Sequence, residues 1–141
     1  MSNLQPHIIR EGSIQYCLGE FKDNNISYDF KKILIYLDAK GKLLFGKSFK
    51  IYEEDEVVLY KLCIYYIRDF EACKKLEIDP NKGILLSGPV GCGKTSLMKL
   101  LRHMVPHQKP YEIIPARNIT FAFNNIGFKT IEEYGNSSFY C

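Results

Sequence analysis

Three glycines, a lysine and a threonine are closely spaced near the middle of the chain, in the run Gly-Pro-Val-Gly-Cys-Gly-Lys-Thr at residues 88–95. Glycines tolerate backbone angles that a Cβ forbids, so successive N–H groups can point inward at an anion. A lysine followed by a hydroxyl residue supplies a compact positive charge and an oxygen ligand for a hard cation. The run matches the pattern G-x4-G-K-S/T of a Walker A phosphate-binding loop without a mismatch. The chemistry predicted for it is binding of a nucleoside triphosphate, with ATP the expected nucleotide.

Each residue type in this loop has an expected role. Lys94 should contact the β- and γ-phosphates, and the Thr95 hydroxyl should bind Mg²⁺. Cys92 occupies a variable position, where a small side chain fits, although a reactive thiol at a helix N-terminus remains an alternative. No catalytic residue is identifiable. The candidate cofactor-binding residues are Gly88, Pro89, Val90, Gly91, Cys92, Gly93, Lys94, Thr95 and Ser96, and Thr95 is the candidate metal ligand.

The segments on either side of the loop are expected to position it. Residues 84–87 form a short apolar run, which predicts a strand buried on both faces. After the loop, leucines and a methionine recur at helical spacing, which predicts a helix from Lys94 to about Val105 that ends at Pro106. A second strand is expected at 111–115, and helices at 117–125 and 130–134. A strand before the loop and a helix after it are the context in which this motif binds phosphate.

The part of the chain before the loop divides by pattern into three segments. The apolar residues among residues 1–28 show no sustained periodicity, and this segment is interpreted as a loosely ordered extension. Within 29–51, two apolar runs flank the turn-forming residues 38–41, which predicts a β-hairpin. Acidic residues at 53–56 and an apolar stripe after them predict a long helix to about Leu76, within a lead-in at 52–79. Residues 80–141 are then interpreted as part of a phosphate-loop core.

Composition limits the class of protein. The chain has 141 residues, 46% of them hydrophobic and 25% charged, as in a soluble globular protein. No apolar run approaches the roughly 18–20 residues of a membrane span, and the N-terminus lacks a signal-peptide pattern, so a cytoplasmic protein without membrane contact is expected. The five cysteines lack metal-ligand spacing, which favours reduced structural thiols. The net charge of +3 is too small to indicate a nucleic-acid partner by itself.

Residues 82–97 resemble the opening of the AAA+ ATPase core, and within that class they look most like the DnaC/IstB-like group of helicase loaders and transposition helper ATPases. Residues 116–134 look like the helix after the second core strand, so the resemblance covers about 54–135. It implies an α/β fold, the N-terminal part of a parallel sheet with flanking helices in the strand order 5-1-4-3-2. Residues 84–87 would be strand 1 and residues 111–115 strand 2, with strands 3 to 5 after Cys141. It also implies ATP and Mg²⁺ as ligands, a role in DNA replication or transposition, DNA and a helicase or transposase as partners, and homo-oligomers.

Other features that the resemblance implies are not identifiable. No apolar strand after Lys94 ends in an acidic pair, since Glu132 and Glu133 follow a single isoleucine in an expected helical turn. Sensor residues and an arginine finger are also missing, which leaves ATP hydrolysis open. Residues 33–38 have the profile of a Walker B strand but precede the loop, and the hairpin interpretation explains them better than a permuted topology.

Other classes of protein are alternatives to an ATPase module. GTP is disfavoured because no Asn-Lys-x-Asp motif is present; Asn81 and Lys82 precede Gly-Ile. A small-molecule P-loop kinase remains an alternative, although no arginine-rich lid follows the loop. A non-catalytic nucleotide-binding module, in which residues 31–77 contact a partner protein or DNA, is also open.

Overall fold

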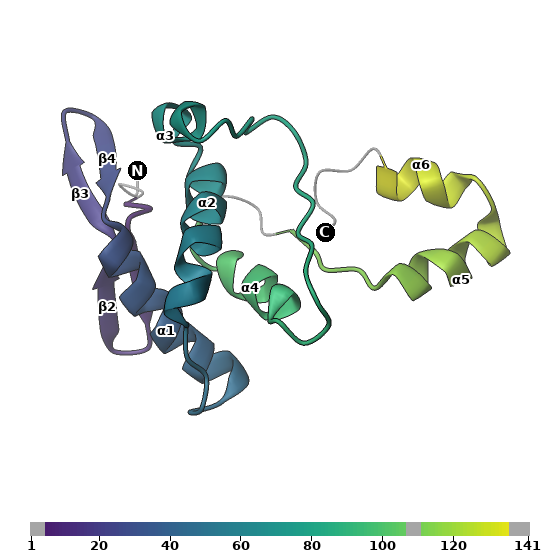
Figure 1. The fold of residues 1–141 in the computed structure, drawn as a ribbon, viewed down its shortest axis with the longest axis horizontal. Coiled ribbons are helices and arrows are strands. Elements are labelled where there is room, and N and C mark those ends of the chain that lie inside the picture. Colours follow the sequence, from purple (N-terminus) through teal and green to yellow (C-terminus); the bar gives the residue numbers. More distant parts are fainter. Residues whose placement is uncertain (1–4, 107–110, 136–141) are drawn as a thin grey trace. The chain divides into compact units, whose positions relative to one another are not determined.

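The computed structural model describes residues 5–106 and 111–135, and contacts divide the chain into two compact units, residues 1–107 and 108–141. The first unit contains two β-hairpins followed by helices (Figure 1). Its elements are β1 (Ile8–Glu11), β2 (Ile14–Cys17), β3 (Gly19–Lys22), β4 (Asn25–Tyr28), α1 (Phe30–Phe45), a 3₁₀ turn (Glu53–Asp55), α2 (Glu56–Ile67), α3 (Phe70–Lys75) and α4 (Lys94–Leu101). The second unit contains α5 (Ala116–Ile126) and α6 (Lys129–Gly135).

The two hairpins occupy a region for which the sequence predicts a loosely ordered extension, so that prediction is wrong for residues 8–28. β1 pairs antiparallel with β2, and β3 pairs antiparallel with β4. Asp23 and Asn24 form the second turn with φ of 51° and 62°, values that these two residue types tolerate better than others. Each strand has only four residues, which is too short for a sustained alternation to be recognised in the sequence.

Helix α1 replaces the β-hairpin predicted within 29–51. The Asp29 carboxylate accepts a hydrogen bond from the backbone N–H of Lys31 at 2.9 Å and so caps the helix N-terminus. Ile33 and Leu37 lie buried one turn apart, whereas Ile35 between them is 64% exposed. The apolar run therefore has helical spacing on its buried side, and this spacing and the cap outweigh the strand propensity of the individual residues.

The residues predicted to turn the hairpin have other roles in α1. A Cβ on Gly41 would collide with the ring of Phe49, so glycine permits a close approach rather than a turn. Asp38 forms an ion pair with Lys42 one helical turn later. The segment with a Walker B profile is thus part of a helix, and the permuted topology is excluded.

The long helix predicted for residues 53–76 is present but interrupted. Arg68 adopts a left-handed conformation, with φ of 62°, and ends α2. Asp69 then caps α3 by accepting a hydrogen bond from the N–H of Ala72 at 3.0 Å. The interruption turns α3 away from the direction of α2 (Figure 1).

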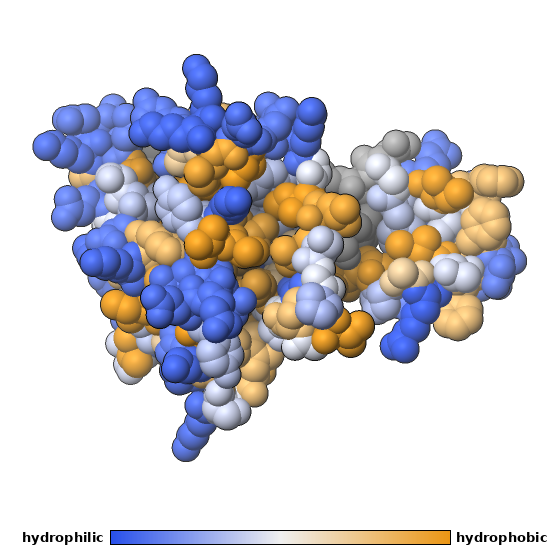
Figure 2. All heavy atoms as spheres, in the orientation of Figure 1, coloured by the Kyte–Doolittle hydropathy of each residue, from blue (hydrophilic) through white to orange (hydrophobic). Residues whose placement is uncertain are grey.

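One hydrophobic core lies within the first unit, where α4 packs against both α1 and α2. The buried residues of this core are Ile9, Leu18, Ile33, Tyr36, Leu37, Leu59, Leu62, Cys63, Leu100, Leu101, Met104 and Val105. Apolar side chains also remain on the surface, as the orange atoms in Figure 2 show; Leu43 and Val57 are more than half exposed. No helix of the described residues is long and apolar enough to span a membrane.

A parallel sheet is not formed by the residues that the structure describes. Residues 84–87, predicted as a buried strand, run without a strand partner, and Leu85 is 92% exposed. Residues 111–115, predicted as the second strand, contain only an isolated bridge at Glu112. A strand buried on both faces needs a paired strand on each side, and no described segment supplies one. The fold of these residues is mixed α and β, with two small antiparallel sheets.

The helices predicted after the loop are confirmed. α4 begins at Lys94 as expected but ends at Leu101, before the predicted end at Val105. In the second unit, α5 and α6 cover the predicted helices at 117–125 and 130–134. They are joined at Gly127, with φ of 66°, and the rings of Phe123 and Phe128 meet edge to face at 5.3 Å.

Candidate functional site

The phosphate-loop motif forms a tight, exposed turn that leads directly into α4. Gly91 and Gly93 have φ of 84° and 88°, angles that L-residues rarely adopt. Gly93 is the N-cap of α4, and no side chain caps this end of the helix. Its first-turn N–H groups are therefore available to an anion, which the helix dipole also favours.

The side chain of Lys94 folds back against the backbone of the loop. Its Nζ donates hydrogen bonds to the carbonyl oxygens of Gly88 at 2.7 Å and Pro89 at 2.6 Å, and lies 3.4 Å from Sγ of Cys92. A Cβ on Gly88 would come within 3.1 Å of that sulfur. Glycine at 88 and the small side chain at 92 thus let the loop wrap around the ammonium group. The positive charge lies where the motif would receive phosphate.

Other candidate residues surround this centre. Val90 at the tip of the loop is fully exposed, and Thr95 is exposed on the first turn of α4. Ser96 and Lys94 are half-buried. The structure therefore brings Gly88, Pro89, Cys92 and Lys94 together and leaves Thr95 exposed.

Helix α4 anchors the loop to the core of the first unit. Leu100 and Leu101 are fully buried, and Leu97 packs against the core from one turn earlier. Met104 and Val105 continue this contact after the helix ends. The exposed loop is thus held at one end by four buried apolar side chains, each of which contributes about 1.5–3 kcal/mol on burial.

The segment before the loop is tied to α2 by side chains that the sequence motifs do not include. The Tyr65 hydroxyl donates to the carbonyl oxygen of Lys82 at 2.6 Å, and Arg68 donates to the Asn81 side chain at 2.9 Å. This segment and α2 enclose a pocket of about 360 Å³ lined in part by Leu62, Tyr65 and Ile84. No sequence pattern predicts these contacts, because the partners lie 17 and 13 residues apart in the chain.

The acidic pair of α6 does not belong to the unit that carries the loop. Glu132 and Glu133 are exposed residues of α6, in the second unit. Among residues 5–106 and 111–135, no group of three or more His, Cys, Asp or Glu side chains is arranged to hold a metal ion.

The similarity found to curated proteins is short. A 35-residue stretch, 25% of the chain, is 54% identical to proteasome-activating nucleotidases of Pyrococcus abyssi and Thermococcus onnurineus. The corresponding protein of Pyrococcus furiosus is 51% identical over the same length. The chain spans about 9% of the length of these relatives. No protein-family model and no solved structure matches the chain. This partial similarity to an AAA+ ATPase suggests nucleotide binding and does not reach the DnaC/IstB-like group.

Proposed function

We propose that the chain binds Mg²⁺-ATP through residues 88–96. The observation that carries this proposal is the Lys94 ammonium group enclosed by the loop, beside an uncapped helix N-terminus. Within residues 5–106 and 111–135, its hydrogen-bond acceptors are two carbonyl oxygens and a sulfur, none of which is an anion. A triphosphate offers stronger, charged acceptors for the same donor, and the glycine backbone N–H groups add further donors.

The loop residues fit ATP in distinct ways. Gly88, Gly91 and Gly93 keep the loop free of side chains where phosphate oxygens approach, and Lys94 would exchange its carbonyl partners for the β- and γ-phosphates. Thr95 is exposed, so its hydroxyl can bind Mg²⁺ together with phosphate oxygens. The pocket of about 360 Å³ before the loop is a candidate site for the nucleoside.

Binding without turnover is the function that we propose for this chain acting alone. ATP hydrolysis needs a group that orients the attacking water and an additional positive charge in the transition state. Neither is identifiable beside the loop among the described residues. A steady-state phosphate-release assay should give a rate far below 1 s⁻¹, and a rate of that order, abolished by Lys94→Ala, would contradict this part of the proposal.

A narrower role in DNA replication or transposition rests on the resemblance of residues 82–97 and 116–134 alone. It entails a DNA partner and a helicase or transposase partner. ATP turnover measured with and without single-stranded DNA tests it, because stimulation by DNA is expected only of a protein that couples the two.

A nucleotide series tests the main proposal most simply. Calorimetric titration of the full chain with ATP, ADP and AMP in Mg²⁺ should give affinities that fall with each phosphate removed, because Lys94 and the loop recognise phosphate rather than base. A parallel titration with GTP measures the contribution of the base. Equal affinities for ATP and AMP would show that the loop does not bind the phosphates.

A further inference from the structure

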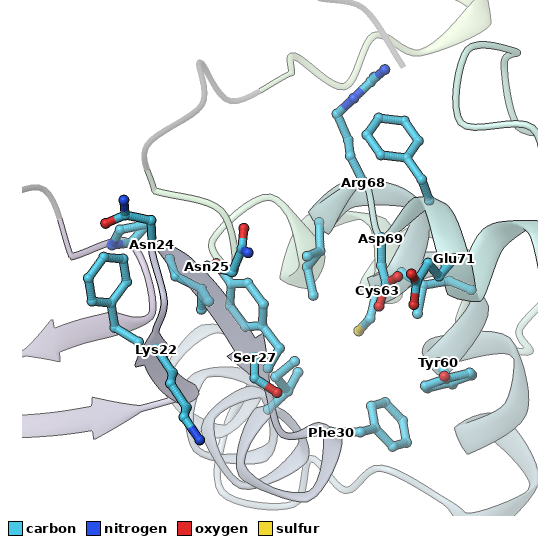
Figure 3. Close-up of a pocket in the computed structure, with 18 residues that line it drawn as sticks. Lys22, Asn24, Asn25, Ser27, Phe30, Tyr60, Cys63, Arg68, Asp69 and Glu71 are labelled. Carbon is cyan, nitrogen blue, oxygen red and sulfur yellow. The ribbon is translucent and has the colours of Figure 1, made fainter.

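A second pocket of the first unit is formed by residues far from the loop in sequence, between the β3–β4 hairpin and the α2–α3 segment (Figure 3). Its volume is about 810 Å³. Aromatic and aliphatic side chains form its floor, among them Tyr28, Phe30, Tyr60, Ile64 and Phe70. Phe30 and Tyr60 meet edge to face at 5.1 Å and join the two walls at one end of the pocket.

Strand β4 presents its edge to this pocket. A strand that faced the pocket with one surface would contribute alternate residues, whereas all four residues of β4 line it. The two-residue turn makes Lys22 and Asn25 a hydrogen-bonded pair, and pairs alternate from there in an antiparallel ladder. The bond from Asp29 N–H to the Leu18 carbonyl oxygen, at 2.8 Å, falls where this alternation places a hydrogen-bonded pair.

The alternation of hydrogen-bonded and non-hydrogen-bonded pairs determines which backbone groups of β4 point away from β3. Ile26 and Tyr28 lie opposite Phe21 and Gly19 in pairs without mutual hydrogen bonds, so their N–H and C=O groups point away from β3. Neither residue takes part in any other backbone hydrogen bond described for the first unit. The pocket thus has an apolar floor and one wall that carries a row of backbone donors and acceptors.

Charged side chains at the rim restrict the occupant further. Arg68 already donates a hydrogen bond to the Asn81 side chain, and Asp69 already accepts one from the N–H of Ala72. Lys22 on the hairpin and Glu71 on α3 also line the pocket, and within the described residues neither has an ion-pair partner. An occupant with one acidic and one basic side chain would complement both.

We propose that this groove binds an extended peptide segment of a partner protein, which adds to the free edge of β4 as a third strand. The outward N–H and C=O groups of Ile26 and Tyr28 would pair with the peptide backbone, and alternate apolar side chains would enter the floor. Lys22 and Glu71 would select a segment that carries an acidic and a basic residue. A small apolar ligand would leave the row of backbone groups unused, and only a peptide strand satisfies the edge and the floor together.

A selection experiment tests this proposal with a defined probe. A display library of random eight-residue peptides is selected on the full chain, and one selected peptide is labelled for fluorescence anisotropy. The critical variant is Ile26→Pro, which removes the outward N–H but no bond between β3 and β4, because proline is tolerated on an edge strand. Ile26→Ala is the matched control, since it removes the same side chain and keeps the N–H.

The expected result is an affinity about tenfold lower for Ile26→Pro than for Ile26→Ala, the effect of losing one hydrogen bond and leaving its partner unpaired. Equal affinities for the two variants would overturn the proposal. Selection of no peptide that binds the wild-type chain would also overturn it, as would bound peptides that Lys22→Glu and Glu71→Lys do not weaken.

A second measurement covers the case in which Ile26→Pro disturbs the hairpin. N-methylation of each backbone amide of the selected peptide in turn should lower its affinity for the wild-type chain at every second position, because alternate amides of a strand face the partner. Losses without this period of two would show that the peptide does not bind as a strand.

A sedimentation measurement without peptide separates this mode from pairing between two copies, since a chain that is already dimeric through β4 would not bind the peptide at all.

Discussion

The phosphate loop and the hydrophobic core of residues 5–106 are built in opposite ways. The loop consists of consecutive residues, is exposed, and is held by its own glycines and by Lys94. The core combines residues from the hairpins, α1, α2 and α4, and many of them, such as Leu59, are completely buried. The difference implies that changes in the loop should alter ligand binding with little effect on stability, while changes in the core should do the reverse.

The largest effect is expected for Leu59→Ala. Leu59 is 0% exposed in α2, so its truncation leaves a cavity and should lower the free energy of unfolding by about 2–5 kcal/mol. Urea denaturation followed by circular dichroism measures this change. Val57→Ala on the same helix is the control, because Val57 is 64% exposed and its truncation should change stability by about 0.5 kcal/mol or less. Similar losses for both variants would show that α2 is not packed as described.

Two glycine substitutions compare the phosphate loop with the turn between β1 and β2. Gly91 and Gly12 have φ of 84° and 60°, and no atom lies within 4 Å of an added Cβ at either position. Alanine therefore costs about 1–2 kcal/mol of backbone strain at both. Gly12→Ala should lower the melting temperature, because the β1–β2 ladder holds its turn. Gly91→Ala should instead weaken Mg²⁺-ATP binding by about tenfold, because the loop can relax when it is empty.

Thermal unfolding and calorimetric titration of both glycine variants separate these effects. A fall in melting temperature for Gly91→Ala as large as that for Gly12→Ala would contradict the contrast between the loop and the β1–β2 turn.

The smallest effect concerns the ion pair between a hairpin and α1. Glu11 accepts hydrogen bonds from Lys40 at 2.7 Å and Tyr36 at 3.2 Å. The bond from Lys40, more than any other contact, lowers the pKa of the Glu11 carboxyl below its ordinary value of 4.5. A carboxyl with a lowered pKa in the folded state contributes stability above pH 4.5, and this contribution is lost as the pH falls through the folded-state pKa.

Unfolding free energies at several pH values between 7 and 3 measure this contribution, which should be about 1 kcal/mol or less for a partly exposed pair. Glu11→Gln should flatten the acid side of the profile by that amount, since glutamine does not titrate. An unchanged profile for the variant would show that this ion pair does not stabilise the fold.

The glycine-rich turn before α4 could be predicted from the sequence because it depends on consecutive residue types. The helices that follow it were predictable for a similar reason, since their apolar spacing is local. The enclosure of Lys94 by the carbonyl oxygens of Gly88 and Pro89 could not be predicted, because it depends on the path of the loop backbone.

The first half of the fold was predicted less well, for physical reasons that differ by element. In α1, residues 38–41 have the composition of a turn, and the role of Gly41 is determined by Phe49, a contact that the sequence does not reveal. The strands β1 to β4 are too short to show a period. Residues 84–87 have the composition of a buried strand, but a strand forms only where another strand pairs with it. The groove beside β4 combines residues 22–28 with 60–71, so no local pattern indicates it.

The central claim, that residues 88–96 bind a triphosphate, is tested most directly by calorimetric titration of Mg²⁺-ATP into the wild-type chain and into Lys94→Ala. Lys94 is half-buried and lies outside the core cluster, so the variant should unfold at the same temperature as the wild type. Loss of its charge-assisted hydrogen bonds should weaken binding by about 2–3 kcal/mol, roughly 30- to 150-fold. Equal affinity for Mg²⁺-ATP in two equally folded proteins would contradict the assignment of this loop.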